Sequence, residues 1–186
     1  MRLLHTSSLT LHEYFDKSVP AYGILSHTWA ENEEVSYQEM SNLSPSIKAK
    51  TGYKKIINCA HTIKELGYDY VWIDTCCIDK SSSAELSESI NSMYNFYKNS
   101  KVCLAYMADV PRDASLDERS AKDVMIQVEF LKPYGLDKCP TFQTSRWFTR
   151  GWTLQELIAP TNVVFYDSGW QVIAKGTEHL SDCKRS

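Results

Sequence analysis

The sequence predicts an α/β domain in which a mostly parallel β-sheet carries helices on both faces. Short, nearly continuous apolar runs, rich in β-branched or aromatic residues, alternate with segments whose apolar residues follow helical spacing. Continuous apolar runs are typical of strands covered on both faces, and strands alternating with helices are typical of βαβ units. The length of 186 residues suits one domain with its own core.

Four runs have the composition of buried strands. They are Tyr22–Leu25, Tyr70–Ile73, Val102–Met107 and Val163–Tyr166. Three segments are predicted to be helices, namely Tyr53–Leu66, Ala84–Asn99 and Trp152–Ile158. Gly67 follows the first helix as a C-terminal stop. Ser82 and Glu85 match a capping box at the start of the second helix.

The stretch between the third and fourth strands fits this rhythm poorly. Residues 109–144 are charged at first and then carry prolines and a glycine. We interpret them as an insertion over the edge of the sheet, with a helix from Leu116 to Leu131. The predicted organisation is one domain over residues 1–175, followed by a tail at 176–186.

Composition and charge argue against several classes of protein. The net charge is −3, so there is no electrostatic reason to expect binding to nucleic acid or to an anionic membrane. No apolar run approaches the ~18 residues that a membrane-spanning helix needs. The start of the chain becomes polar before a signal-peptide core forms. These features predict a soluble cytoplasmic protein.

The six cysteines are scattered and form no Cys-x-x-Cys pair. Their positions are 59, 76, 77, 103, 139 and 183. We expect free thiols in a reducing compartment and no metal site. As an alternative, the neighbours Cys76 and Cys77 form a redox-active or metal-binding pair, although adjacent side chains on an extended segment point to opposite faces.

Polar residues follow two of the predicted strands directly, where an open α/β sheet binds its ligands. The first strand runs into Ser26, His27 and Trp29, and the second ends at Asp74. We interpret these residues as lining a binding site, in which Asp74 holds a ribose hydroxyl. The structural alternative is a capping serine, a packed tryptophan and a carboxylate that accepts hydrogen bonds from loop N–H groups.

A third segment combines aromatic residues with a carboxylate. Trp147, Trp152 and Glu156 fall within ten residues, and Trp152 and Glu156 share a helix face. An indole beside a carboxylate desolvates it and raises its pKa, as active-site acids require. The structural alternative is an exposed glutamate on an amphipathic helix whose tryptophan enters the core.

Together these segments resemble the HET domain, the module of fungal heterokaryon incompatibility. The resemblance covers about residues 1–170 and rests on Tyr22–Trp29, Tyr70–Lys80, Ser89–Tyr94, Val102–Val110 and Arg146–Leu157. HET domains look like divergent relatives of TIR domains, the α/β modules of innate immunity, so the resemblance implies a flavodoxin-like sheet. It also implies that Ser145, Trp147, Glu156 and Leu157 correspond to the catalytic helix of TIR domains. The Trp-to-Glu spacing is wider than in TIR domains unless Trp152 is the equivalent residue.

The resemblance implies a role in heterokaryon incompatibility and programmed cell death, through NAD⁺ hydrolysis that releases nicotinamide. Glu156 is the expected catalytic residue of this NAD⁺ glycohydrolase. The expected NAD⁺-binding residues are Ser26, His27, Trp29, Asp74, Trp147 and Trp152. NAD⁺ or a related nucleotide is then a substrate rather than a prosthetic group. We also expect a homo-oligomer when active and an activating protein. The alternative is a non-catalytic scaffold that signals by self-association.

Overall fold

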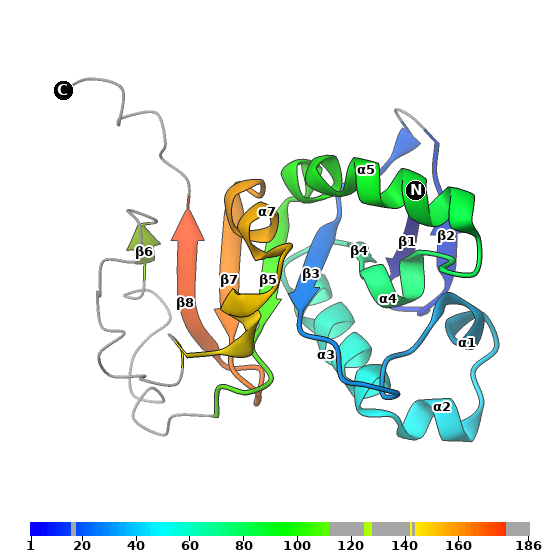
Figure 1. The fold of residues 1–186 in the computed structure, drawn as a ribbon, viewed down its shortest axis with the longest axis horizontal. Coiled ribbons are helices and arrows are strands. Elements are labelled where there is room, and N and C mark those ends of the chain that lie inside the picture. The colour runs from blue at the N-terminus through cyan, green and yellow to red at the C-terminus, as the bar shows by residue number, and fades with distance from the viewer. Residues whose placement is uncertain (16–17, 112–124, 128–141, 143, 178–186) are drawn as a thin grey trace.

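In the computed structural model, which describes residues 1–15, 18–111, 125–127, 142 and 144–177, eight strands form one sheet (Figure 1). Their order across the sheet is β2-β1-β4-β3-β5-β7-β8-β6. The centre of the sheet consists of four parallel strands, β4 (Tyr70–Trp72), β3 (Gly23–His27), β5 (Val102–Tyr106) and β7 (Asn162–Tyr166). All four strands predicted from apolar runs are therefore confirmed. Every residue of β3 is buried, as expected for a strand covered on both faces.

Three pairings outside the central strands are antiparallel, so the sheet is mixed, with four of its seven described pairings parallel. On one side β1 (Arg2–His5) pairs antiparallel with β4 and with β2 (Leu11–Glu13). On the other side β8 (Val172–Thr177) pairs antiparallel with β7. The sequence analysis missed these three strands. No residue of β2 is fully buried. Hydrogen bonds to β1, rather than an apolar run of its own, therefore make this segment a strand.

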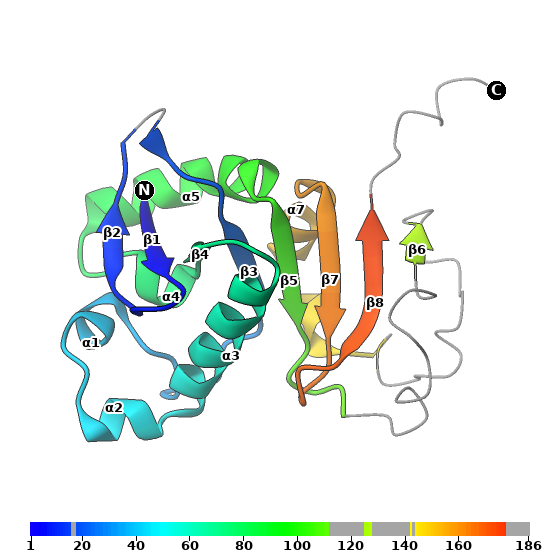
Figure 2. The ribbon, with the colours of Figure 1, turned by 180° about the vertical axis from the view of Figure 1, so that it is seen from behind.

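Helices cover both faces of the sheet, as predicted. Figures 1 and 2 show α3 (Thr51–Glu65) on one face, with α4 (Asp74–Cys77), α5 (Ser83–Asn99) and α7 (Thr153–Ile158) on the other. The helices α3, α5 and α7 confirm the three predicted ones. The sequence analysis did not predict α4 or the short helices α1 (Tyr37–Ser41), α2 (Pro45–Ala49) and η4 (Arg146–Thr149), which is a 3₁₀ turn.

The local signals at the helix ends are confirmed only in part. Gly67 adopts a positive φ of 89° after α3, which is the conformation that glycine allows at a helix end. The Ser82 side chain accepts a hydrogen bond from the backbone N–H of Glu85 and so caps α5. The Glu85 carboxylate, however, does not complete the capping box. It accepts a hydrogen bond from the backbone N–H of Asp79 and forms an ion pair with Arg2, which ties α5 to β1.

The strand order reverses its direction at β3. From β3 the chain crosses through α3 to β4 on one side, and then through α5 to β5 on the other side of β3. It continues in the same direction through α7 to β7. Crossovers between parallel strands are right-handed, so a change of direction places the helices on opposite faces. The carboxyl end of β3 therefore lies at the point where open α/β sheets bind ligands.

The predicted insertion is described only in small part. Within 109–144, residues Met125–Gln127 form β6, which pairs in parallel with β8. The predicted helix Leu116–Leu131 is wrong for these three residues, and the rest of it lies outside the described residues. β8 continues to Thr177, two residues into the predicted tail, whereas residues 178–186 lie outside the description. Within the described ranges, no helix combines the length and apolar character needed to cross a bilayer.

Candidate functional site

Two groups of polar side chains meet at the carboxyl end of β3. Successive residues of a strand point to opposite faces. Ser26 accordingly contacts residues of η4 and α7, whereas His27 lies close to Lys55 of α3 and its neighbours. Both side chains are fully buried. The end of one strand thus contributes to two neighbouring polar clusters, which Ser26 and His27 join from opposite faces of β3.

The first group, the Glu156 cluster, consists of Ser26, Tyr97, Trp147, Arg150 and Glu156. The Ser26 hydroxyl donates to Oε2 of Glu156 at 2.6 Å and accepts from Nε1 of Trp147 at 2.7 Å. Arg150 donates to both oxygens of Glu156, each at 2.8 Å. The Tyr97 hydroxyl lies 3.3 Å from Oε1. Side chains from β3, from α5 and from the residue that follows η4 therefore converge on one carboxylate of α7.

The chemistry of this group follows from the burial of its carboxylate. The Glu156 side chain is only 4% exposed, and an isolated charge at such depth is very costly. A two-point guanidinium contact and two hydroxyl donors offset that cost. Burial, together with the charge of Glu156, raises the pKa of Tyr97 well above its ordinary value. The phenol therefore keeps its proton and donates a hydrogen bond to the carboxylate.

The two tryptophans near Glu156 have different environments. Trp147 is fully buried and joins the cluster through Ser26, whereas Trp152 is 42% exposed. The backbone N–H of Glu156 bonds to the carbonyl of Trp152, as their i and i+4 positions predicted. The carboxylate is nevertheless enclosed by Ser26, Tyr97 and Arg150. Of the two indoles, the structure brings the Trp147 ring, not that of Trp152, into the cluster.

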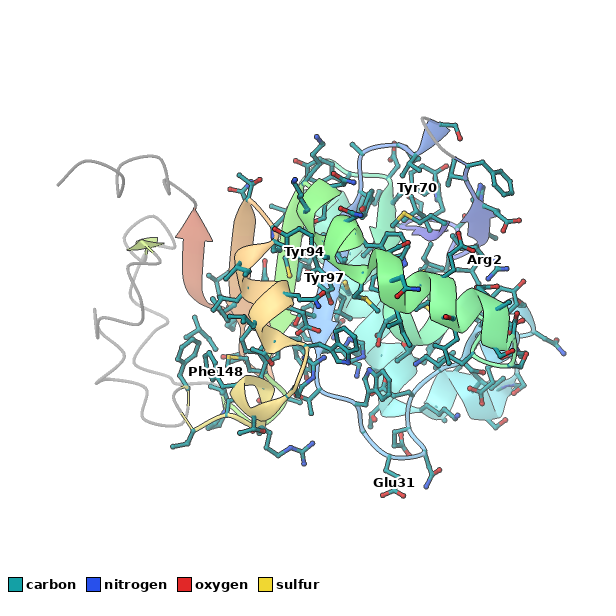
Figure 3. All side chains as sticks on the ribbon, turned by 45° about the horizontal axis from the view of Figure 1, so that its top comes forward. Arg2, Glu31, Tyr70, Tyr94, Tyr97 and Phe148 are labelled. Carbon is teal, nitrogen blue, oxygen red and sulfur yellow. The ribbon has the colours of Figure 1, made fainter. Side chains whose placement is uncertain are left out.

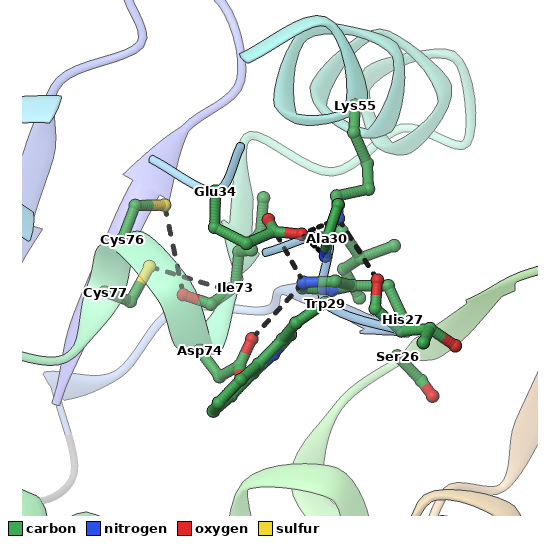
Figure 4. Close-up of polar contacts among 12 residues, drawn as sticks. Ser26, His27, Trp29, Ala30, Glu34, Lys55, Ile73, Asp74, Cys76 and Cys77 are labelled. Atoms are coloured by element: carbon green, nitrogen blue, oxygen red, sulfur yellow. Dashed lines mark hydrogen bonds and ion pairs between the residues drawn. The ribbon is translucent and has the colours of Figure 1, made fainter. Parts of the chain in front are cut away.

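The second group, the His27 cluster, comprises His27, Trp29, Glu34, Lys55 and Asp74 (Figure 4). Nε2 of His27 lies 3.6 Å from Glu34 and 3.7 Å from Asp74. Lys55 of α3 forms an ion pair of 2.5 Å with Glu34. The Trp29 indole donates to Oδ2 of Asp74 at 3.0 Å. Three of the predicted binding residues, His27, Trp29 and Asp74, therefore lie together, with two charged residues that the sequence analysis did not identify.

Several buried polar atoms of the His27 cluster have no hydrogen-bond partner within the described protein. They are Nδ1 and Nε2 of His27, Oε2 of Glu34, Oδ1 of Asp74 and the hydroxyls of Thr28 and Thr75. Native proteins leave few buried polar atoms unpaired, so such a concentration is typical of a functional site. Burial and the nearby Lys55 charge lower the pKa of His27, which is therefore neutral at pH 7.

The buried neutral imidazole makes stability depend on pH. Because the pKa of His27 is lower in the folded state, the unfolded chain binds the extra proton first as the pH falls below ~6.5. Folding stability is therefore complete above pH ~6.5 and decreases by about 1.4 kcal/mol per pH unit below it, until the folded state also binds the proton. Burial alone would raise the pKa of Glu34, but the imidazole of His27 in its protonated form and the Lys55 ammonium lower it to about 2. The contribution of the Glu34 carboxylate to folding stability is therefore lost only at lower pH, below ~4.5.

We expect His27→Asn to remove the slope between pH 6.5 and 5, and urea unfolding at several pH values measures it. The exposed His61→Asn variant is the matched control and should keep the slope of the unsubstituted protein. An unchanged slope in His27→Asn would contradict a neutral buried His27.

Gly52 controls the position of the loop that carries Glu34. A β-carbon at Gly52 would lie 2.3 Å from the carbonyl oxygen of Glu33 and 2.9 Å from Cα of Glu34, both backbone atoms that no side-chain rotation can move. We expect Gly52→Ala to destabilise the domain by about 1–3 kcal/mol through overpacking, measured by thermal unfolding. Gly151→Ala is the control, because nothing lies within 4 Å of its added β-carbon. Equal stability of the two variants would show that the loop with Glu33 and Glu34 moves aside without destabilising the domain.

The cysteines of the described chain are buried free thiols, as expected for Cys59, Cys76, Cys77 and Cys103. Cys76 and Cys77 lie on α4 rather than on an extended segment, and both are buried. The hydrogen bond with Cys77 and burial raise the pKa of Cys76 well above its ordinary value, which disfavours the reactive thiolate. Cys139 and Cys183 lie outside the described residues. Among the described residues, no group of three histidine, cysteine or acidic side chains is placed to hold a metal ion.

Comparison with known proteins identifies the family. The model of the family described as "Heterokaryon incompatibility protein (HET)" matches residues 22–156. The chain belongs to the HET family. It is also 44% identical over 153 residues to the vegetative incompatibility protein HET-E-1 of Podospora anserina, a match that covers 80% of this chain. The chain spans about a tenth of that relative's length, since the match covers 10% of it. No solved structure matches.

The matched HET segment coincides with both clusters. It begins one residue before β3 and ends at Glu156. The first sequence motif supplies Ser26 and the second supplies Asp74, while the third supplies Trp147 and Glu156. The motifs on which the resemblance rested are therefore the segments that the fold brings to the end of β3.

Four members of the two clusters were missed by the sequence analysis of this HET domain. They are Glu34, Lys55, Tyr97 and Arg150. Glu34 lies on the loop between the first motif and α1, and Lys55 lies on α3, so both stand outside the motifs. Tyr97 lies within the predicted helix Ala84–Asn99, where the position of its hydroxyl gave no signal. Arg150 did have a signal, because it stands six residues before the only glutamate of the third motif.

Proposed function

We propose that this HET domain acts in heterokaryon incompatibility by hydrolysing NAD⁺ to nicotinamide and ADP-ribose, as an assembly-dependent cytoplasmic enzyme. The observation that carries the proposal is the buried Glu156 carboxylate, held by the side chains of Ser26, Tyr97 and Arg150 at the point where the strand order reverses. The name of the relative, a vegetative incompatibility protein, supports the biological role. The buried free thiols favour a reducing compartment.

The order of the parallel strands supports the relationship to TIR domains. Numbered along the chain, β3, β4, β5 and β7 stand in the order 2-1-3-4. This is the beginning of the flavodoxin-like order 2-1-3-4-5, whose ligand site lies beside the first strand. TIR domains share this order, and their catalytic glutamate lies on a helix that precedes a strand. Glu156 on α7, which precedes β7, occupies the corresponding place.

The proposed reaction breaks the bond between the ribose and the nicotinamide nitrogen. The bonding electrons pass to the pyridinium ring, so nicotinamide leaves as a neutral molecule and needs no strong acid. The ribose becomes positively charged, as in glycoside hydrolysis. The Glu156 carboxylate stabilises that charge and holds a ribose hydroxyl. Water then forms the new C–O bond and releases one proton.

Arg150 sets a condition on this mechanism, because it occupies both oxygens of Glu156. Its side chain is 20% exposed, so it has access to solvent. We infer that Arg150 withdraws when substrate binds and that the paired arrangement is the resting state. A requirement for assembly fits this inference, since contacts with a second copy or an activating protein then stabilise the open arrangement.

The experiment that tests the function is direct. Purified protein is incubated with NAD⁺ at increasing protein concentration, while nicotinamide release and light scattering are followed together. Release that rises with assembly supports the proposal. An assembled oligomer that releases no nicotinamide would overturn it.

A second candidate function is a non-catalytic scaffold that signals by self-association. It is favoured by apolar side chains exposed on neighbouring helices. Ile90 and Tyr94 of α5 and Leu154 and Ile158 of α7 are all exposed, and Leu154 is 66% exposed. Figure 1 shows these helices side by side on one face, and Figure 3 labels Tyr94 there. On this hypothesis a cell-death response survives loss of Glu156 but is lost when Leu154→Glu prevents association.

A further inference from the structure

Trp29 is a half-exposed aromatic ring fixed in place at the candidate site. The side chain is 53% exposed although it follows a fully buried strand directly. Its indole N–H donates to Asp74 at 3.0 Å, so the ring cannot rotate without losing a charged acceptor. A rigid, exposed aromatic face is a ready surface for a planar ligand.

One face of this ring already attracts a cation. The Lys80 ammonium lies 3.9 Å from the centre of the ring, which is the geometry of a cation–π contact. Among the described residues no carboxylate forms an ion pair with Lys80, and Lys80 is itself exposed. The contact with the ring is therefore what holds the ammonium there, and a competing cation displaces it without breaking an ion pair.

The surroundings of Trp29 favour a cation that carries amide groups. Asp74 binds the ring edge through one oxygen, while its buried Oδ1 has no hydrogen-bond partner. The buried hydroxyl of Thr75 and both ring nitrogens of His27 are also unpartnered, and His27 is only 1% exposed. Negative charge at the ring edge strengthens its attraction for cations. Oδ1 of Asp74 is an acceptor, whereas the neutral imidazole of His27 offers one donor and one acceptor, so these unpaired groups suit an amide, which both donates and accepts.

We propose that Trp29 and Asp74 form a binding site for a planar pyridinium cation bearing a carboxamide, and that Lys80 occupies the ring face until this ligand displaces it. In the proposed reaction, such a cation is the nicotinamide end of NAD⁺ before cleavage. The site prefers the charged ring to the neutral product, because a neutral nicotinamide does not gain the cation–π attraction. It thereby favours departure of the product.

This inference rests on the proposed function only for the identity of the natural ligand. It is therefore tested with the N-methylnicotinamide cation, which has no ribose bond and is not hydrolysed. The indole N–H signals of ¹⁵N-labelled protein are followed by NMR during titration, and the signal of Trp29 is assigned by its absence from Trp29→Leu. Binding of this cation is thus measured separately from hydrolysis of NAD⁺, so either can be absent without the other. A protein that binds the cation but does not hydrolyse NAD⁺ supports the site and counts against the enzyme.

The expected results separate a cation site from an ordinary exposed tryptophan. N-Methylnicotinamide should shift the Trp29 signal and should bind about tenfold more weakly to Trp29→Leu, as expected for loss of a partly desolvated cation–π contact. Lys80→Ala should bind it several-fold more tightly, because the competing ammonium is gone. Neutral nicotinamide should bind more weakly than the cation.

Two outcomes would overturn the proposal. One is a Trp29 signal that does not move at millimolar N-methylnicotinamide in either the unsubstituted protein or Lys80→Ala. The other is equal affinity for the cation and for neutral nicotinamide, which would reduce the site to simple stacking. Lys98→Ala, a substitution of an exposed lysine on α5, is the matched control and should leave the affinity unchanged. The substituted side chains are all exposed or half-exposed, and the dispersion of the NMR spectrum checks that each variant folds.

Discussion

Glu156→Gln is expected to lower nicotinamide release from NAD⁺ by about 100- to 1,000-fold, the usual loss when one electrostatic stabiliser of a transition state is removed. The amide has nearly the same shape as the carboxylate, and its single oxygen can still accept the hydrogen bond of either Ser26 or Tyr97. It carries no charge, however, and so cannot stabilise the positive ribose. The loss should appear in kcat rather than only in KM.

The control for this variant is Glu88→Gln, which removes an exposed carboxylate from α5 on the same face of the sheet. It should retain full activity. Circular dichroism and thermal unfolding of both variants separate a chemical defect from an unfolded domain. A folded Glu156→Gln protein with full activity would remove Glu156 from the mechanism, whatever the role of the domain in signalling.

Arg150→Met is expected to cause a large loss of stability, by about 3–5 kcal/mol, because it leaves the buried Glu156 carboxylate without its counter-charge. For a domain of this size, that loss corresponds to a decrease in Tm of about 10 °C. The methionine preserves much of the packing of the arginine stem, so the effect reports the charge. Unfolding in urea and by heat measures it.

Two further variants decide whether the charge is the cause. Arg146→Met removes an exposed guanidinium from the neighbouring turn and should change stability by less than about 0.5 kcal/mol. Arg150→Met combined with Glu156→Gln removes both charges and should recover most of the lost stability. A double variant no more stable than Arg150→Met alone would show that the arginine acts through packing.

The Arg150→Met variant also shows whether the Arg150–Glu156 pair is the resting state of an enzyme or only a structural ion pair. If Arg150 withdraws to admit substrate, the Arg150→Met protein should release nicotinamide at a lower protein concentration than the unsubstituted domain needs. This comparison is made under conditions in which the variant remains folded. If the pair serves only stability, Arg150→Met destabilises the domain but leaves the dependence of activity on protein concentration unchanged. Scattering and nicotinamide release, measured on the same samples, provide this comparison.

The amino-acid sequence by itself determined the central frame of this domain. Four apolar runs and three helical patterns carry their own hydrophobic signal, because burying those residues favours one local structure. The three motifs also placed Ser26, His27, Asp74 and Glu156 near strand ends or on the following helix before any contact was known. These residues lie within segments whose local structure is strongly determined.

The tertiary structure alone decided the sheet edges and the partners of the site. β1 and β8 are strands because a neighbouring strand offers hydrogen bonds, and no short segment encodes its neighbour. Tyr97 and Arg150 meet at Glu156 only because α5, η4 and α7 pack on the same face. Helical spacing indicated Trp152 as the tryptophan that desolvates Glu156, but the turn of η4 buries Trp147 instead. Contacts between distant segments depend on how helices stack on the sheet, and local periodicity does not contain that information.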